Sequence, residues 1–240
     1  MRRTQLVKWT VTALVTALTI PGLPALGYRK VIRYADFSDT SALRLNGTAA
    51  VTGGALRLTS GLRSQAGTAW STTRLNTEKT FQTTFDVSMT GGVTHADGLA
   101  FVLQTDGPSV VGGRGGSIGY GGLTHSVAVE LDTYRNPNDP DNSHVAIVTG
   151  GKSDDPATAV SVPLFGQTLR IRINYDAQTQ LMKVRLRSVE AGTAEVKLLT
   201  QEVDLREALG SRRAWMGFTA ATGQEMATQE IHNWTVKVAR

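Results

Sequence analysis

The chain has 240 residues, of which 40% are hydrophobic, a formal net charge of +5 and no cysteine. This length suits one all-β domain or two small domains. Without disulfides, an exported chain must obtain its stability from a large core, a bound metal or oligomerisation. No cluster of Lys and Arg interleaved with aromatic residues occurs in the sequence, so we expect no nucleic-acid partner.

The first residues have the order of features found in a secretory signal peptide. Arg2, Arg3 and Lys8 form a positive region, and residues 11–20 form a short apolar run. Residues 21–27 break this run and end in the small-residue pattern Ala25-Leu26-Gly27. This order indicates a cleaved signal. An uncleaved anchor is the weaker alternative, because the apolar run is short for a bilayer.

We therefore predict a signal peptide over residues 1–27 and one secreted domain over residues 28–240. No second long apolar run follows, so no membrane span is expected after signal removal. The signal holds three basic residues and no acids, and its loss lowers the formal charge from +5 to +2. The basic character of the whole chain thus says little about its partners.

Most periodic segments alternate apolar and polar residues with a period of two, as strands with a core on one side do. The segments that follow this rule are residues 55–59, 81–87, 169–175, 181–187 and 234–238. Glycine pairs and short polar turns separate them, and only residues 204–209 suggest a helical turn. Many short strands divided by such turns predict an all-β sandwich or jelly roll.

We expect the first and last strands to be adjacent and Trp70, Trp215 and Trp234 to lie in the core. Residues 96–103 begin with Ala-Asp-Gly and continue as an apolar run. Such a strand is expected to be buried on both faces, with Asp97 at its N-terminal end. A simple turn before a strand explains the Asp-Gly pair equally well.

Residues 112–122 form a glycine-rich segment. Glycine lets backbone N–H groups approach a ligand closely. A phosphate-binding loop is excluded, because no Lys-Ser/Thr follows and the flanks are not strand–loop–helix. A mobile surface loop is the alternative interpretation.

The most informative stretch is residues 127–144, which begins as an apolar strand and ends as a polar loop. In an extended strand, Glu130, Asp132 and Tyr134 share one face. Two carboxylates on one face repel each other unless a cation lies between them. Turn preferences explain acids in a loop but not two acids within an apolar strand, where an unpaired charge is costly.

The loop after this strand supplies further oxygen and nitrogen ligands. They are Asn136, Asn138, Asp139, Asp141 and His144. Hard oxygen ligands suit calcium, whereas an imidazole added to carboxylates suits manganese or another transition metal. The stretch therefore predicts a metal site with room for two ions.

The same stretch resembles the metal-binding segment of the legume-type (L-type) lectins. Residues 54–59, 69–72, 215–223 and 231–234 resemble other strands and loops of that family, in the same order. The resemblance covers nearly all of the chain after the signal. It implies a concanavalin A-like jelly-roll sandwich of antiparallel sheets. It also implies that the protein is a secreted, bacterial-style member of the L-type lectin family.

The resemblance also implies metal ligands. Asp132 and Asp139 would bridge two ions, and the Asn136 side chain and the Tyr134 carbonyl would hold Ca²⁺. The gap between Asn136 and Asp139 is shorter than in the plant lectins, so Asn138 is an alternative ligand. A second position, for Mn²⁺ or another transition metal, would be completed by the two residues that remain, Glu130 and His144.

A sugar site is implied beside the metals. By resemblance, a cis peptide bond joins Ala96 to Asp97, whose carboxylate accepts hydrogen bonds from sugar hydroxyls. A backbone N–H of Gly115 or Gly116 would donate to the sugar, with the register uncertain by a residue or two. The Asn136 amide would complete the polar contacts.

The walls of this site would select the sugar. The Tyr134 ring offers an apolar surface for a sugar face. Gln224 and Glu225 occupy the loop that varies in the family and tunes specificity, although both are equally well explained as solvated turn residues.

The predicted function is therefore metal-dependent, non-catalytic binding of glycans, with a homo-oligomer through the flat back sheet as a further expectation. A glycoside hydrolase on the same sandwich is one alternative, but hydrolysis needs a second placed carboxylate. Thr133, Tyr134 and Arg135 occupy the positions where it would lie. A metal-stabilised adhesion or structural module is the other alternative.

Overall fold

The computed structural model describes residues 27–92, 95–152 and 158–240. The predicted signal therefore lies outside the described residues, except for Gly27. Within the described part, no helix combines the length and the apolar character that a membrane crossing requires.

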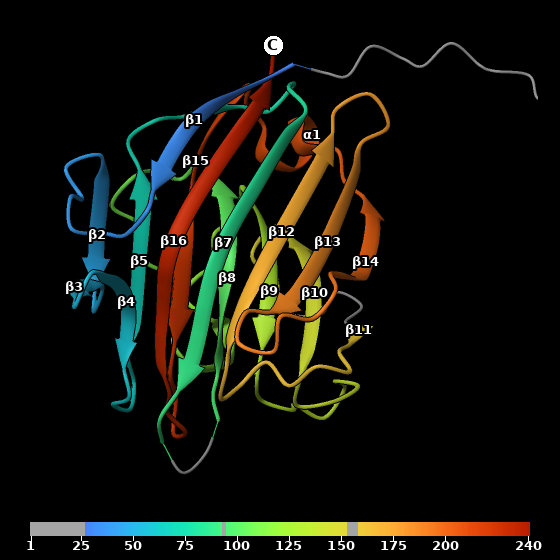
Figure 1. Cartoon of the computed structure of the whole chain (residues 1–240). Helices are drawn as coiled ribbons and strands as arrows, with labels where there is room; N and C mark the ends of the chain where they lie inside the picture. Colours follow the sequence, from blue (N-terminus) through green and yellow to red (C-terminus); the bar gives the residue numbers. More distant parts are fainter. Residues whose placement is uncertain (1–26, 93–94, 153–157) are drawn as a thin grey trace, which may run out of the picture.

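The chain forms two eight-stranded antiparallel sheets packed face to face (Figure 1). The first, here called the β7 sheet, faces the viewer in Figure 1. In order across the sheet it contains β14 (Val196–Glu202), β13 (Leu181–Ser188), β12 (Thr168–Asp176), β7 (Phe81–Thr90), β16 (Thr228–Ala239), β4 (Ala55–Ser60) and β3 (Ala50–Thr52), with β1 (Tyr28–Tyr34) paired to β16.

The second, here called the β9 sheet, lies behind it and carries the candidate site. In order across the sheet it contains β11 (Thr158–Ala159), β10 (His144–Thr149), β9 (Ser126–Asp132), β8 (Gly98–Gln104), β15 (Arg213–Ala221), β5 (Ala66–Ser71) and β2 (Leu43–Gly47), with β6 (Leu75–Asn76) paired to β15. A 3-10 turn, η1 (Gly115–Ser117), and a short helix, α1 (Leu205–Leu209), complete the elements.

The core between the sheets is built on an aromatic cluster. Phe85 of the β7 sheet meets Phe218 of the β9 sheet edge-on, with ring centroids 4.9 Å apart. Trp234 contacts Phe218 at the same distance, 4.9 Å. Such edge-to-face pairs add to the burial of apolar area that holds two sheets together. The all-β sandwich predicted from the sequence is confirmed.

Local predictions agree with this arrangement. Strand β12 alternates partly exposed and buried residues along its whole length, so one face lines the core. The first and last strands are adjacent, since Tyr28 pairs with Ala239. The predicted helical turn is α1, and the Asp204 side chain caps it by accepting hydrogen bonds from the backbone N–H groups of Arg206 and Glu207.

Strands β8 and β9 are buried on both faces. Their inner face contacts the sandwich core. A second apolar cluster, which includes Trp70, Ile118, Tyr120 and Ala128, packs on the other side. Because Ile118 and Tyr120 belong to the glycine-rich segment, that segment covers the sheet.

The prediction that Trp215 lies in the core is wrong. Its neighbour Met216 faces the core and is fully buried, so Trp215 points to the other side of β15 and is partly exposed. The guanidinium carbon of Arg74 lies 4.5 Å from the centre of its ring. A cation over an aromatic face is favourable and covers the ring in place of the core.

A buried polar network ties three strands of the β7 sheet together. The Asp86 carboxylate accepts two hydrogen bonds from Arg170, each 2.6 Å long, and one from Asn233, also 2.6 Å. Burial raises the pKa of Asp86, but the hydrogen bonds from Arg170 and Asn233 and the charges of Arg170 and Arg187 outweigh it and hold this pKa below its ordinary value.

We expect Asp86→Asn to destabilise the fold by about 1 to 3 kcal/mol near neutral pH, because it removes the charge that Arg170 faces. A carboxylate with a depressed folded pKa stabilises above its unfolded pKa, and this contribution is lost as pH falls through the folded pKa. The difference between the two proteins in urea unfolding should therefore shrink below about pH 4.

Asp106→Asn is the matched control, since Asp106 pairs with His125, a largely exposed side chain. We expect a change within about 0.5 kcal/mol for this variant. Equal losses in both variants, or a loss in Asp86→Asn that does not depend on pH, would contradict the assignment.

Candidate functional site

The register of β9 and β10 brings two acids and an imidazole together. Asp132 pairs directly with His144, and Glu130 pairs with Ala146 on the adjacent strand. All three polar side chains are buried. One ligand atom from each of Glu130, Asp132 and His144 lies within 4.8 Å of the others. Two strands therefore assemble three metal-ligating groups that are 14 residues apart at most in the sequence.

The orientation of the His144 ring is fixed by a contact of the ring nitrogen that points away from the carboxylates. Its Nδ1 lies 2.7 Å from the carbonyl oxygen of Asp141. A carbonyl can only accept a hydrogen bond, so Nδ1 carries a proton and Nε2 is the nitrogen that faces the carboxylates. Nε2 lies 3.6 Å from Asp132 Oδ2 and 3.7 Å from Asp139 Oδ1. This arrangement of a metal-binding imidazole is the usual one.

The cluster has an excess of negative charge. The pKa of Asp132 is raised to about 8, chiefly by burial and next by the charge of the Glu130 carboxylate. A hydrogen bond from the Tyr134 backbone N–H lowers it, while Asp139 and Asp97 add to the rise. Like charges held this close in a buried place favour a cation between them. The donor set of carboxylates and imidazole fits a divalent ion.

The loop after β9 folds back so that Asp139 reaches the cluster. The Asn136 backbone N–H donates to Asp139 Oδ2 at 2.7 Å, and the Asp139 N–H donates to the Asn136 carbonyl at 3.0 Å. Asn136 Nδ2 lies 3.8 Å from the position that a Cβ on Gly116 would take. Asn138 is exposed. This placement favours Asn136 over Asn138 as the residue that faces the site.

The glycine-rich segment is an organised element rather than a mobile loop. Gly112 donates to the Gly119 carbonyl at 2.8 Å, and Gly119 donates to the Gly113 carbonyl at 2.9 Å. A Cβ on Gly112 would lie 2.7 Å from the Gly119 oxygen, so only glycine fits there. The segment also supplies Tyr120, whose buried hydroxyl donates to Glu130 Oε2.

Asp97 lies beside this cluster at the start of β8. The Ala96–Asp97 peptide bond is cis, as the family resemblance implied. The Asp97 N–H donates to the Ala221 carbonyl at 3.2 Å, and its own carbonyl accepts from the Thr133 N–H at 3.0 Å. Thr133 directly follows Asp132, so the backbone of Asp97 is held by the end of the acidic strand.

The carboxyl group of Asp97 has a free acceptor. Its pKa is raised to about 6: burial is the main cause and the Glu225 charge adds to it, while a hydrogen bond from the Gly223 backbone N–H opposes the rise. Its Oδ2 atom is buried and has no hydrogen-bond partner within the described ranges. A buried polar atom without a partner is costly, which indicates a ligand that donates to it.

The predicted ligand-binding residues converge around Asp97. Gly115 donates to the Thr222 carbonyl at 3.2 Å, and a Cβ on Gly223 would lie 3.2 Å from the Gly115 Cα and 3.4 Å from Asp97 Oδ2. Asp97, the glycine-rich segment and the loop after β15 thus meet in one surface.

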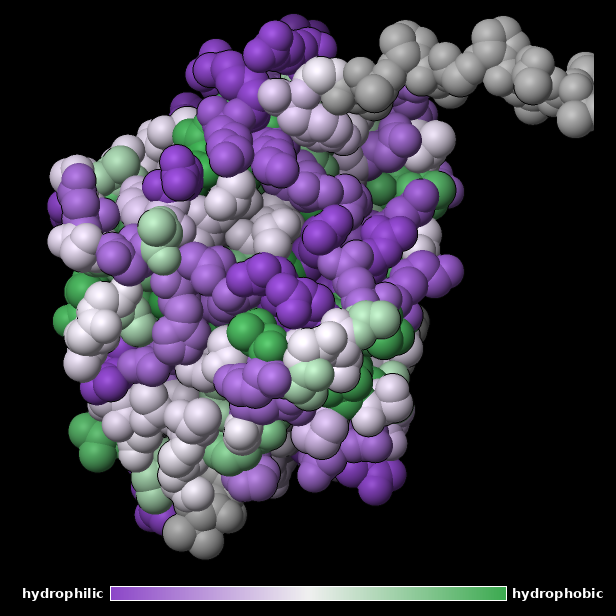
Figure 2. All heavy atoms as spheres, in the orientation of Figure 1, coloured by the Kyte–Doolittle hydropathy of each residue, from purple (hydrophilic) through white to green (hydrophobic). Residues whose placement is uncertain are grey.

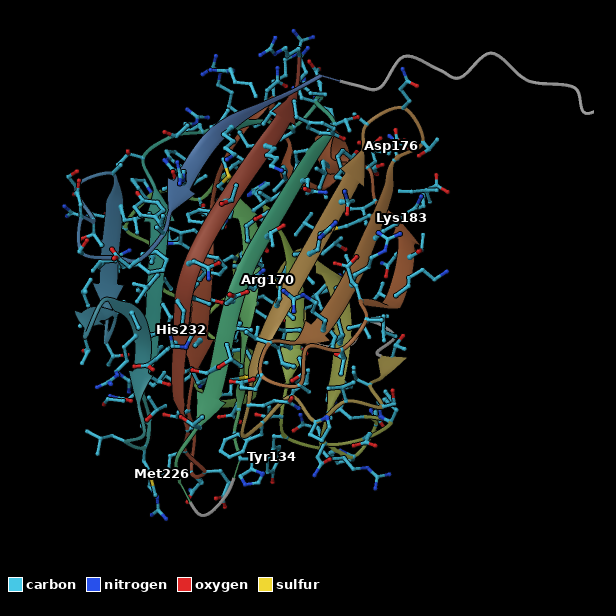
Figure 3. All side chains as sticks on the ribbon, viewed as in Figure 1. Tyr134, Arg170, Asp176, Lys183, Met226 and His232 are labelled. Atoms are coloured by element: carbon cyan, nitrogen blue, oxygen red, sulfur yellow. The ribbon has the colours of Figure 1, made fainter. Side chains whose placement is uncertain are left out.

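The remaining predicted residues lie around this surface. Gly116 is beside Asn136, as described above. Tyr134 is 42% exposed, Gln224 is exposed and Glu225 is half-buried. In Figure 3, Tyr134 and Met226, the residue after Glu225, lie at the same end of the sandwich.

Comparison with known proteins identifies the family and supports the fold. The model of the family described as the legume lectin beta-barrel domain matches residues 33–235. The chain belongs to the legume lectin family. The resemblance of residues 127–144 to the lectin metal-binding segment is therefore part of a similarity to the family that covers most of the chain.

Individual relatives are moderately similar. An L-type lectin-domain containing receptor kinase V.9 of Arabidopsis thaliana is 29% identical over 185 residues, which are 68% of this chain and 28% of that protein. The chain also spans 55% and 27% of the lengths of two further relatives. It therefore covers less than two thirds of the length of each of these proteins.

Solved structures extend the comparison to the whole fold. Lectin I-B4 from Griffonia simplicifolia, in a metal-free form, is 25% identical and aligns with a TM-score of 0.76 over 85% of this chain and 97% of its own. Winged bean acidic lectin complexed with methyl-α-D-galactose is 24% identical and aligns with a TM-score of 0.77 over 89% of this chain and 99% of its own. The winged bean lectin shares the two-sheet sandwich fold of this chain.

Three residues that support the site are not evident from the sequence. They are Tyr120 in the glycine-rich segment, Gly223 after β15 and Thr133 after β9. Each acts through a contact between segments that are distant in the sequence, and no local sequence pattern predicts such a contact.

We expect added Ca²⁺ and Mn²⁺ to raise the unfolding temperature of chelator-treated protein. An ion at about 100 times its dissociation constant stabilises by about 2.7 kcal/mol, since it binds only the folded cluster. The rise should shrink as pH falls, because protons compete with the ion for the ligands. Calorimetry with and without metal measures this rise.

His144→Ala should lose most of the rise, and His125→Ala should keep it, because His125 pairs with Asp106 far from the cluster. An equal rise in both variants would place the ion elsewhere.

Proposed function

We propose that this legume lectin family member is a secreted, non-catalytic protein that binds glycans with the help of metal ions. The observation that supports the proposal is the buried, unpartnered Asp97 Oδ2, which faces a surface shared with the glycine-rich segment. An acceptor beside backbone N–H groups suits the hydroxyls of a sugar. The relatives and structural neighbours named above are lectins or contain a lectin domain.

The metal centre would be held by the predicted ligand set, in which carboxylates predominate. These residues are Glu130, Asp132, Tyr134 through its carbonyl, Asn136, Asp139 and His144. We propose Ca²⁺ in the oxygen-rich part and Mn²⁺ or another transition metal beside the imidazole. Bound ions would supply the positive charge that the buried carboxylates lack.

The sugar would be held by residues already in position. The Asp97 carboxylate would accept from a sugar hydroxyl, and the Gly116 N–H and the Asn136 amide would donate, because the Gly115 N–H already donates to the Thr222 carbonyl. Because the cluster and the loops fix these groups beforehand, little ordering is left for binding. Galactose is the first sugar to test, since the winged bean neighbour was solved with a galactoside.

The rim of the site would set its specificity. Tyr134 offers an exposed ring edge and face to the apolar side of a sugar. Gln224 and Glu225 form the wall on the opposite loop, and the charge of Glu225 already acts on Asp97. A small open site of this kind binds weakly, so avidity would require several copies on one partner or in one assembly.

We expect Asp97→Asn to lower affinity for the bound glycan by at least about 100-fold, or about 2.7 kcal/mol. The amide keeps the size of the side chain but presents a donor where a sugar hydroxyl donates. A glycan array followed by titration calorimetry, with Ca²⁺ and Mn²⁺ present, measures the loss. Chelation of the metals should abolish binding of the parent protein.

Asp106→Asn should bind as the parent does, and metal content should be the same in all three proteins. A folded, metal-loaded parent that binds no glycan would overturn the proposal and favour a metal-stabilised structural module. Release of reducing sugar from a glycan would instead favour the hydrolase.

A further inference from the structure

The outward face of the β7 sheet concentrates positive charge. Four pairs of cations stand directly opposite each other on neighbouring strands of this sheet. They are Arg170 with Arg187, Arg172 with Arg185, Arg185 with Lys197, and Lys30 with Lys237. Like charges directly opposite in a sheet destabilise it. Such an arrangement therefore depends on compensating acids nearby or on a partner of opposite charge.

Internal compensation is partial. Asp86 pairs with Arg170, and Glu195 lies 3.0 Å from Arg172 and 3.8 Å from Arg185. Across the described ranges, no ion pair involves Lys30, Lys183 or Lys237.

The remaining acids lie at the margins of the face. Asp176 is at one end of β12, and Glu190 accepts hydrogen bonds from Thr168 at the other end. Glu230 is occupied by Arg57 at 2.8 Å. Figure 3 shows Arg170 and Lys183 on this face, with Asp176 near its upper end, and Figure 2 shows that strongly hydrophilic residues gather across the same area.

The face is hollowed into a trough of about 390 Å³ with cationic walls and a polar floor. Its lining residues are Lys30, Gln82, Thr84, Arg170, Arg172, Asn233, Thr235 and Lys237. The register explains the shape, because Thr84 of β7 stands between Arg172 of β12 and Thr235 of β16. Short side chains in the middle strands leave a channel between the long cations on either side.

The charge continues beyond the trough. Lys30 is shared with a larger hollow of about 720 Å³ at the end of the sandwich where the chain ends. The cations that line this second hollow are Arg29, Lys30, Arg74, Lys79, Arg213 and Arg240, and none of its lining residues is acidic. The two hollows form one positively charged path around the edge of the sheet.

We propose that this path binds an acidic polysaccharide, at a place separate from the glycan site built on Asp97. Cations in two linked hollows are complementary to a chain of regularly spaced anionic groups. Complementary charge also increases the rate of association. Hydroxyls and amides on the trough floor suit a partner rich in hydroxyls. A face-to-face second copy would bring like charges together, which argues against this face as a subunit interface. A homo-oligomer through this sheet stays a prediction that sedimentation of the parent and trough variants tests.

Two other polyanions fit the face less well. Single-stranded nucleic acid is usually held by aromatic side chains on which bases stack, and the trough lining contains none. A membrane surface is usually bound with exposed apolar side chains inserted among the lipids. The trough lining contains none, and the larger apolar residues that line the second hollow are buried or half-buried: Val31, Leu75, Met216 and Val238. A hydroxyl-rich acidic chain remains the occupant that matches both the walls and the floor.

The test compares binding of polygalacturonate and heparin with binding of neutral dextran. The parent protein should bind both acidic polymers, fail to bind dextran, and lose affinity as salt rises from about 0.05 to about 0.3 M, because salt screens exposed charges. Arg172→Gln combined with Lys237→Gln should weaken binding at least about 10-fold at low salt, since each removed cation faces the trough.

The matched control is Arg44→Gln with Arg206→Gln, which makes the same change in net charge at exposed positions on β2 and α1. It should bind acidic polymers within about 2-fold of the parent, because distant exposed charges are screened. The conservative pair Arg172→Lys with Lys237→Arg should restore binding. Unfolding midpoints verify that all variants are folded.

Several results would overturn the proposal. These are equal losses in the trough and control variants, tighter binding of single-stranded DNA or of phosphatidylserine vesicles than of either acidic polymer, and a stable dimer in sedimentation that the trough variant dissociates. Asp97→Asn should leave polygalacturonate binding unchanged while it abolishes binding at the proposed sugar site. Failure of one site can thus be told apart from failure of the other.

Discussion

The repulsion between carboxylates buried at the end of β9 is the constraint on which the site depends. Glu130 and Asp132 cannot move apart, because β8 and β10 hydrogen-bond the strand on both sides. Asp139 is brought to the same place by the loop, and His144 is aimed at it by the Asp141 carbonyl. A cation would relieve this repulsion, so on the proposed function the ion that completes the site would also stabilise the fold.

The ligand surface depends on this cluster through very short connections. Gly98, the residue after Asp97, pairs with Asp132, and Thr133 holds the Asp97 carbonyl. Tyr120 links the glycine-rich segment to Glu130. Whatever fixes the acidic cluster therefore also fixes the groups that surround the free oxygen of Asp97. Metal and ligand sites coupled in this way need few residues and no large motion.

The two sheets carry different chemistry because they meet solvent differently. The outer face of β8 and β9 is covered by the glycine-rich segment, so polar groups there are few, buried and convergent. Within the described part of the chain, no loop covers the outer face of the β7 sheet in this way, and its charged side chains form a broad surface exposed to water. The first arrangement suits recognition of a small ligand, and the second suits a long charged one.

Much of the fold and candidate site followed from the sequence alone, because alternating strands, glycine turns and the acid-rich strand 127–132 are local patterns. The resemblance to lectins placed Asp97 and His144 in one site. Only the tertiary structure showed that Tyr120 and Thr133 support that site, and that Trp215 faces outward. It also decided the cationic face: Lys30, Arg172, Arg185 and Lys237 are scattered along the sequence, and strand register alone sets them side by side. The alternation of apolar and polar residues can be read from the sequence, but the register between strands determines which charged side chains lie opposite each other.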